Sequence, residues 1–259
     1  MTEHTPDGVL DQNYAYDRMM KPELRWRLAT RARVIVDAAR RFLHSQRGLM
    51  VLDMGCAEGR TMLEISAQLP DSVLDGVEYS TDLVEAAVAL PECVRIWQGD
   101  ITALPTNISA ESYDIVSALA VLEHLSTPVS AVREAQRVLK SGGIFVATSP
   151  SPAWDHLSAT LGLLKGDAHV FDVNKSFLME IVREAGLEPL EYRRFMWAPV
   201  AFLPYLHIRP SPRLALRVDR IVEGLRFLNW MFANQAIIAR KPLHDKEDQQ
   251  PNKGIEHDR

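Results

Sequence analysis

The feature that most constrains this 259-residue chain is the segment VLDMGCAEGR at residues 51–60. An apolar run ends at Asp53, and a turn containing Gly55 and Gly59 leads directly into a helical pattern. Glycine is needed where a chain turns sharply from a buried strand into a helix, or where a ligand approaches the backbone closely. The segment therefore predicts a strand–turn–helix unit with a nucleotide-like ligand at its turn. Ala57 stands between the two glycines, where a third Gly is commoner.

Apolar runs and amphipathic segments alternate along the rest of the chain. Strands are expected at 48–55, 72–80, 93–100, from 113, and at 144–150, 187–197 and 234–242. Helices are expected at 22–44, 60–69, 81–90 with Thr81 as cap, 128–143 closed by a glycine pair, and 174–186 with a glycine stop. Short connections between strands and helices predict parallel βαβ units. The fold class is therefore α/β, a doubly wound, Rossmann-like, mostly parallel sheet.

Composition narrows the class of partner. The formal net charge of −5 argues against nucleic acid as the main partner, because phosphate binding requires a basic surface. Two cysteines without CxxC spacing predict neither a disulfide framework nor a cysteine-rich zinc site. The first residues are polar, and no apolar run is long enough to span a bilayer, so we expect a cytoplasmic protein.

Three regions are expected from the chain pattern. Residues 1–45 form an N-terminal segment and helix over the ligand site, residues 46–241 the main domain, and residues 242–259 a solvated tail. An insertion at 198–231 carries five Arg against two acids and a helical apolar stripe of Leu214, Val218, Ile221, Val222, Leu225, Leu228 and Phe232. The insertion is interpreted as a packed lid that sets substrate specificity. The alternative is weak contact with a membrane surface through residues 209–226.

The charges in the turn discriminate between ligands. A nicotinamide enzyme has Gly at the first, third and sixth positions, where this chain has Gly55, Ala57 and Arg60. Asp53 and Glu58 would repel a pyrophosphate, whereas they favour the ammonium and sulfonium of S-adenosylmethionine. Farther along, Glu78 ends the second strand, where an acid can accept both ribose hydroxyls.

Two residues beyond the third strand are candidates for contact with adenine. Asp100 can accept the adenine amino group, and Ile101 can pack on the ring; the alternative for Asp100 is a turn-forming role. Tyr79 is a candidate for stacking on adenine or for the core. At the N-terminus, Tyr16 is expected to place its ring near the sulfonium, where cation–π attraction operates.

VLDMGCAEGR, DGVEYS, QGDITALP, YDIVSALAVLEHL and REAQRVLKSGGIFVATSPSP resemble, in order and spacing, the motifs of class I S-adenosylmethionine-dependent methyltransferases. The small-molecule group that includes quinone-biosynthesis enzymes is the most similar. The resemblance implies a seven-stranded sheet whose last strand is antiparallel. It also implies that S-adenosylhomocysteine is the product and that the cofactor is bound by Asp53, Gly55, Cys56, Ala57, Gly59, Glu78, Asp100 and Ile101, with Ala118 and Leu119 beside the sulfonium.

Glu123 and His124 are the candidate catalytic residues. By the same resemblance the pair lies near the substrate mouth, where some relatives add a third ligand and hold a divalent cation. That third position is Ala120 here, so no metal is expected. His124 is interpreted as a general base, since imidazole titrates near neutrality. The alternative is that both side chains fix the following loop by hydrogen bonds.

The expected activity is methyl transfer from S-adenosylmethionine to a small-molecule or lipid-like acceptor, on oxygen, nitrogen or carbon. Two alternatives from other classes are a non-catalytic scaffold that keeps the cofactor fold, and a nicotinamide-dependent oxidoreductase. Binding of S-adenosylhomocysteine without binding of NAD would favour the methyltransferase over the oxidoreductase. Binding without turnover against any acceptor would favour the scaffold.

Overall fold

The seven strands form one sheet in the order β3-β2-β1-β4-β5-β7-β6. The computed structural model describes residue 16 and residues 22–87, 90–154, 160, 173–202 and 211–243. The first five strands run parallel, whereas β7 runs antiparallel to both of its neighbours. The strands are β1 Met50–Met54, β2 Val73–Glu78, β3 Val94–Gln98, β4 Tyr113–Leu119, β5 Leu139–Pro150, β6 Glu188–Trp197 and β7 Phe232–Arg240. The doubly wound sheet with an antiparallel last strand is confirmed.

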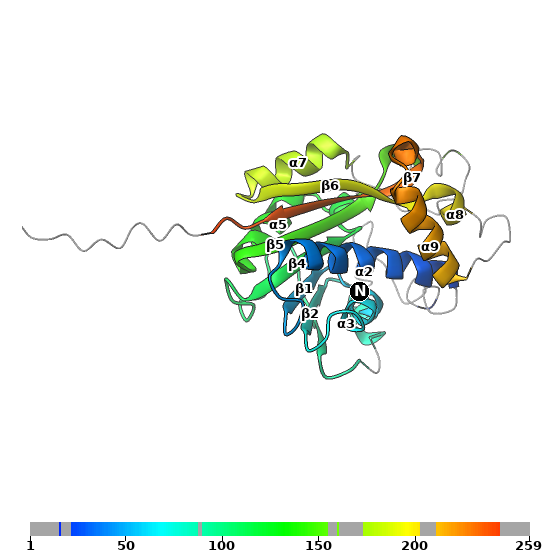
Figure 1. Ribbon diagram of the computed structural model, residues 1–259. Coiled ribbons are helices and arrows are strands. Elements are labelled where there is room, and N and C mark those ends of the chain that lie inside the picture. Colours follow the sequence, from blue (N-terminus) through cyan, green and yellow to red (C-terminus); the bar gives the residue numbers. More distant parts are fainter. Residues whose placement is uncertain are drawn as a thin grey trace, which may run out of the picture.

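Helices cover both faces of the sheet (Figure 1). On one face lie α2 (Pro22–Phe42) and α3 (Arg60–Ser66), and on the other lie α5 (Pro128–Val138) and α7 (Lys175–Glu184). Successive residues of a strand point to opposite faces. Val51 accordingly joins the core cluster beneath α2 and α3, and Leu52 joins the cluster beneath α5 and α7. Each face of the sheet therefore has its own apolar core.

Two helix ends match the sequence signals and one does not. The side chain of Asn174 accepts the Phe177 amide at the start of α7, and Gly186 follows its end with φ of +79°. At α4 (Thr81–Glu85), however, the cap is Ser80 rather than Thr81. Ser80 has the extended backbone of a cap and accepts the Leu83 amide, whereas Thr81 is already the first helical residue.

The helix expected at 128–143 ends at Val138, so its closure by the glycine pair is wrong. Leu139 has an extended backbone and pairs with Tyr113, which begins β5 immediately after α5. Gly142 lies inside β5 with φ of +80°, and its amide donates to the Lys241 carbonyl beyond β7. Gly142 and Gly143 lie in an irregular part of β5 and do not end a helix, because pairing with β4 and β7 replaces a further helical turn.

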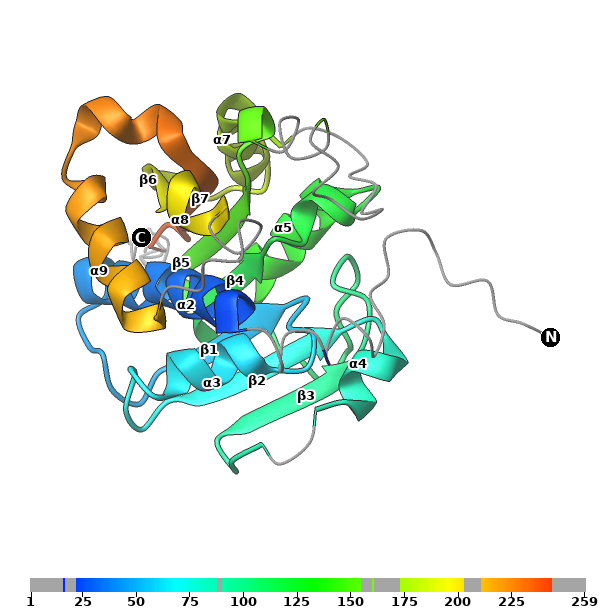
Figure 2. The same ribbon diagram turned by 90° about the vertical axis from the view of Figure 1, so that its right-hand side faces the viewer.

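The insertion at 198–231 lies at the end of the sheet where the parallel strands have their carboxyl ends, which we call the carboxyl edge. It contains α8 (Ala198–Phe202), α9 (Pro212–Glu223) and the 3₁₀ helix η3 (Arg226–Met231). Since β6 runs with the first five strands and β7 runs against them, the connection between them lies at the edge where β1, β2 and β4 end. Figure 2 shows α9 beside α2 at the rim of the molecule.

The apolar stripe predicted for this insertion is only partly correct. The face of α9 that packs inward carries Ala215, Asp219 and Val222, whereas Leu214 and Ile221 are exposed. Asp219 lies on the inward face of α9, where it pairs with Arg33 of α2, so part of the apolar stripe faces outward.

A buried ion cluster holds α9 on α2. Arg33 of α2 is buried, and its Nη2 donates to Asp219 Oδ2 at 2.9 Å and to the carboxylate of Glu223. The Trp197 amide donates to Asp219 Oδ1 at 2.6 Å. Burial raises the pKa of Asp219 and outweighs Arg33 and the backbone donors, which act in the opposite direction; burial raises the pKa of Glu223 as well. The cluster therefore specifies the position of α9 at a cost in desolvation.

Asp219→Asn should alter how stability depends on pH. A carboxyl whose pKa is raised in the folded state contributes stability that is present at low pH and lost as the pH rises through that pKa. Wild type should therefore gain stability relative to Asp219→Asn as the pH falls from neutral through the raised pKa of Asp219. Urea unfolding of both proteins from neutral pH into the acid range measures this change. A loss of wild-type stability relative to the variant toward acid would show that the Arg33 pairing dominates instead.

No helix within the described ranges has the length and apolar character needed to cross a bilayer. Of the expected tail at 242–259, residues 244–259 lie outside the described residues, and so do residues 1–15 and 17–21 of the expected N-terminal region at 1–45. The expected regions and the cytoplasmic location stay predictions.

Candidate active site

The turn after β1 is hydrogen-bonded to the end of β2. The amides of Gly55 and Cys56 both donate to the Val77 carbonyl, at 2.8 and 3.2 Å. Gly55 and Gly59 have φ of +78° and +79°, and Gly59 caps α3. Ala57 also lies in the left-handed region, with φ of +51°. The left-handed conformation costs a residue with a side chain about 1–2 kcal/mol relative to Gly. Ala57, which stands where Gly is commoner, is therefore a point of backbone strain.

Missing side chains at the two glycines let other elements approach the turn. A Cβ added at Gly55 would lie 2.7 Å from Cγ2 of Val121, and one added at Gly59 would lie 2.8 Å from Cδ1 of Ile96 in β3. Val121 is the cap of the 3₁₀ helix η1, Leu122–His124, which carries the candidate catalytic pair. Gly55 thus brings the cofactor turn and the catalytic segment into contact.

Two carboxylates beside the turn are held by defined donors. Glu78, at the end of β2, accepts the Ala57 amide on Oε2 at 2.8 Å and the Ser80 amide on Oε1 at 2.9 Å. Asp53 is buried and accepts the hydroxyl of Ser117 on Oδ1 at 2.7 Å. Both carboxylates are oriented by the protein before any ligand binds, which lowers the cost of binding.

Ser117 is a residue of the site that was not among those expected from the sequence. It lies within the motif YDIVSALAVLEHL, inside the apolar strand β4, and only the pairing of Asp53 with Ser117 between β1 and β4 shows its role. The signal was present as the one serine in YDIVSALAVL, but the strand register was needed to interpret it.

The electrostatic character of the turn is visible at Cys56. Burial raises the pKa of the Cys56 thiol well above its ordinary value, and Asp53, Glu78 and Glu58 each raise it further. Three carboxylates therefore act on one point in the turn. The thiol itself stays neutral and packs over Gly76 of β2, where a Cβ would come within 2.5 Å of Sγ. Such a site favours a cation and disfavours a pyrophosphate.

The adenine candidates differ in their surroundings. Asp100 is exposed, and its Oδ1 accepts the amide and the hydroxyl of Thr102, each at 2.7 Å. This is the turn-forming geometry, and contact with adenine stays a prediction. Ile101 is buried in the core cluster beneath α5 and α7. Tyr79 is 53% exposed, so it belongs to the surface rather than the core.

The end of β4 brings the candidate catalytic residues to the same edge of the sheet. Ala118 and Leu119 are buried, and Ala120 follows in the left-handed region with φ of +54°. On η1, Glu123 is 2% exposed and His124 is partly buried. Within the described ranges, no three His, Cys, Asp or Glu side chains are placed to hold a metal ion. Tyr16 is exposed, and its role over the sulfonium stays a prediction.

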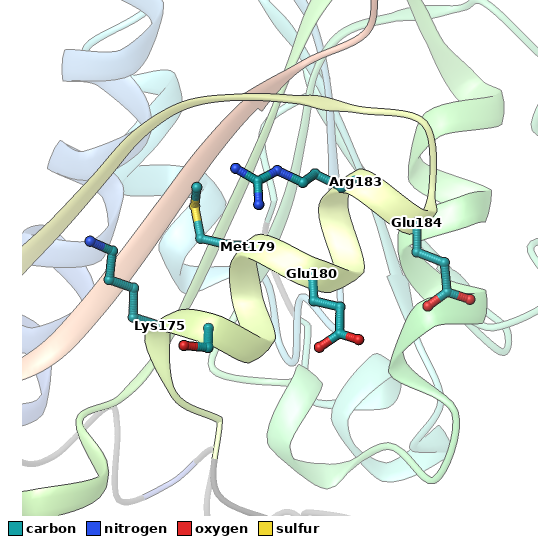
Figure 3. Close-up of a pocket in the computed structure, with 6 residues that line it drawn as sticks. Lys175, Met179, Glu180, Arg183 and Glu184 are labelled. Carbon is teal, nitrogen blue, oxygen red and sulfur yellow. The ribbon is translucent and has the colours of Figure 1, made fainter.

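A surface hollow of about 760 Å³ lies along α7, away from the turn. Figure 3 shows Lys175, Met179 and Arg183 on the side of the helix toward β6, and Glu180 and Glu184 on the other side. Because α7 and the helix that follows the cofactor turn cover opposite faces of the sheet, this hollow is separate from the turn.

Comparison with known proteins places this geometry in a family. A family model described as "Methyltransferase domain" matches residues 52–147. The ubiquinone biosynthesis O-methyltransferase of Bordetella pertussis is 31% identical over 172 residues, which cover 60% of this chain and 69% of that protein. The chain belongs to the S-adenosylmethionine-dependent methyltransferases. Within class I it resembles the quinone-biosynthesis group, and this methyltransferase uses S-adenosylmethionine and releases S-adenosylhomocysteine.

Solved structures support the fold of this methyltransferase. The putative methyltransferase of Haloferax volcanii, in complex with the Trm112 activator, has a TM-score of 0.60 at 18% identity and covers 84% of this chain and 95% of its own. The [4+2]-cyclase SpnF has a TM-score of 0.58 at 22% identity, with 82% of each chain covered. A cyclase on this fold shows that the fold alone does not determine the chemistry.

Gly55→Ala should destabilise the protein more than Gly186→Ala. Both glycines have positive φ, so either substitution costs about 1 kcal/mol of backbone strain, but the space at Gly186 is open. At Gly55 the contact with Val121 adds a further cost of about 1–3 kcal/mol. Chemical unfolding of the two variants measures the difference. Equal losses would show that the Val121 contact yields without cost.

Proposed function

We propose that this methyltransferase methylates an oxygen of a small, lipid-like acceptor, with His124 as the general base. The observation that carries the proposal is the contact between Gly55 and Val121, which holds η1 and its Glu123–His124 pair against the cofactor turn. The B. pertussis relative is named as an O-methyltransferase, which supports oxygen as the accepting atom.

The cofactor-binding residues that we propose follow from the shape and charge of the turn. When bound, S-adenosylmethionine supplies an electrophilic methyl carbon on a sulfonium. Gly55, Ala57 and Gly59 offer backbone that a ligand can approach closely, and Asp53 with Cys56 lies at the base of the turn. The negative potential there complements the ammonium and the sulfonium.

The rest of the cofactor would follow the carboxyl ends of the neighbouring strands. Glu78 would accept the ribose hydroxyls, while the amides of Ala57 and Ser80 keep its carboxylate in place. Asp100 and Ile101 follow β3, on the side where the adenine would lie. Tyr79, which lies between Glu78 and Asp100 along the chain, is exposed. Ala118 and Leu119, at the end of β4, border the position of the sulfonium.

A base is required because most alcohols and phenols keep their proton at neutral pH. His124 lies on the 3₁₀ helix that follows β4, and the fully buried Glu123 is its neighbour. In the proposed reaction the imidazole of His124 would take the hydroxyl proton of the acceptor, and the cofactor held at the turn would supply the methyl group to that oxygen. Alignment of the two reactants supplies much of the remaining rate.

The insertion is the proposed source of acceptor specificity. It lies at the carboxyl edge of the sheet, and the indole Nε1 of Trp154, just after β5, donates to the Trp230 carbonyl of η3 at 2.9 Å. The segment that follows β5 and the insertion are therefore tied together beside the site. Connections over this edge of a doubly wound sheet shape its ligand pockets.

Glu78→Gln should weaken binding of S-adenosylhomocysteine about tenfold or more, because hydrogen bonds to a charged group contribute about 1.5–3 kcal/mol. Glu85→Gln is the matched control, since Glu85 is an exposed residue of α4 and the charge change is the same. Titration calorimetry measures both affinities, and NAD should show no binding to wild type. Equal affinity of the two variants would remove Glu78 from the ribose site.

His124→Gln should lower kcat by about 10²–10⁴-fold with saturating cofactor, while the affinity for S-adenosylhomocysteine stays unchanged. The assay uses a panel of phenols and catechols with and without an alkyl tail, and the tailed compounds should be preferred. His44→Gln, at an exposed position after α2, is the control. Unchanged turnover would leave His124 with the loop-fixing role. Cofactor binding without methylation of any acceptor in the panel would contradict the proposed activity.

A further inference from the structure

The insertion presents large apolar side chains to solvent. Within the described ranges eight large hydrophobic side chains are exposed, and five of them lie between residues 214 and 230: Leu214, Ile221, Leu225, Phe227 and Trp230. Phe227 is 74% exposed, Ile221 69% and Trp230 63%. Single exposed apolar residues are normal on a protein surface, but a cluster of this kind marks an interaction site.

Helical spacing places cations beside these apolar side chains. Leu214, Arg217 and Ile221 recur at i, i+3 and i+7 on the side of α9 opposite the buried Asp219, with Arg213 and Arg220 exposed next to them. We use the name outer face of α9–η3 for these exposed side chains: Arg213, Leu214, Arg217, Arg220 and Ile221 on α9, and Phe227 and Trp230 on η3, which follows it.

The acids of α9 are directed away from this outer face. Asp219 is fully buried, Glu223 is partly buried, and both bind Arg33 of α2. The buried ion cluster thus removes both negative charges from the solvent side of the helix. What remains on the described part of the outer face is three guanidinium groups on a chain whose formal net charge is −5.

We propose that the outer face of α9–η3 docks the protein on an anionic lipid surface. Basic side chains near an anionic bilayer contribute about 1 kcal/mol each, and Trp and Phe insert at the boundary between head groups and acyl chains. The exposed Arg side chains supply the electrostatic attraction, and the exposed aromatic rings supply the apolar contact.

Charge makes a second copy of this chain a poorer occupant. A two-fold symmetric dimer places the same patch on both sides of its interface, which would set the guanidinium groups of Arg213, Arg217 and Arg220 against their own copies. Like charges at close range repel, whereas lipid phosphates oppose all three at once.

The location of the insertion adds a functional consequence. Because α9 and η3 connect β6 to β7, they leave the sheet at the same edge as the cofactor turn (Figures 1 and 2). Docking through them would bring that edge near the source of a lipid-like acceptor. This consequence rests on the proposed function, but the docking itself does not.

Vesicle flotation of the full chain tests the surface. Wild type should float with vesicles of equal parts phosphatidylcholine and phosphatidylglycerol, and not with phosphatidylcholine alone. The triple variant Arg213→Gln, Arg217→Gln, Arg220→Gln should partition about a hundredfold more weakly. The matched control is Arg40→Gln, Arg47→Gln, Arg183→Gln, which removes three exposed cations elsewhere and should float like wild type.

A second variant separates the apolar contribution. Phe227→Ser with Trp230→Ser should also abolish flotation, and it leaves the Trp230 carbonyl that accepts Trp154 in place. All variants should bind S-adenosylhomocysteine in solution as wild type does, so loss of docking is distinguishable from loss of the cofactor site. The proposal would be overturned if wild type failed to float, or if both triple variants lost flotation equally. It would also be overturned if wild type did not bind vesicles but formed dimers that Phe227→Ser with Trp230→Ser converted to monomers.

Discussion

The absence of a side chain at Gly55 is the constraint on which the active site depends. The left-handed backbone there turns the chain from β1 toward α3, and the amide of Gly55 fixes the turn to the Val77 carbonyl of β2. The space where a Cβ would lie is filled by Val121, the residue that begins η1. One position therefore joins the first strand, the second strand and the segment after the fourth. A larger residue would separate the cofactor turn from the catalytic candidates.

Carboxylates have different roles around the turn and in the insertion. Around the turn, Asp53 and Glu78 are oriented by Ser117 and by backbone amides, and together with Glu58 they make a negative site that suits a cationic cofactor. In the insertion, Asp219 serves to position α9 rather than to bind a ligand. Burial outweighs its pairing with Arg33, so the ion cluster is better understood as a device that specifies where α9 lies than as a source of stability.

That ion cluster also explains the surface of the insertion. A helix with an acid on its buried face must expose some of the apolar residues that would otherwise be covered. Leu214 and Ile221 are exposed for this reason, on the side of α9 that also carries exposed arginines, while Asp219 binds Arg33 on the buried side. The same interaction that anchors the helix to α2 therefore creates the basic and apolar outer face.

Much of this protein can be read from its sequence because the decisive signals are local. Alternating apolar runs and capped helices predict the seven strands, since strand and helix periodicity depend on near neighbours along the chain. The Gly spacing and the acids of residues 51–60 identify the donor for the same reason. The tertiary structure decided what depends on distant partners. Pairing with β4 and β7 ended the helix at Val138, the Asp53–Ser117 register revealed a site residue that was not among those expected, and the pairing with Arg33 on α2 placed α9 so that its apolar stripe faces partly outward. These outcomes are set by contacts between residues far apart in the chain, and such contacts leave no periodic trace in the sequence.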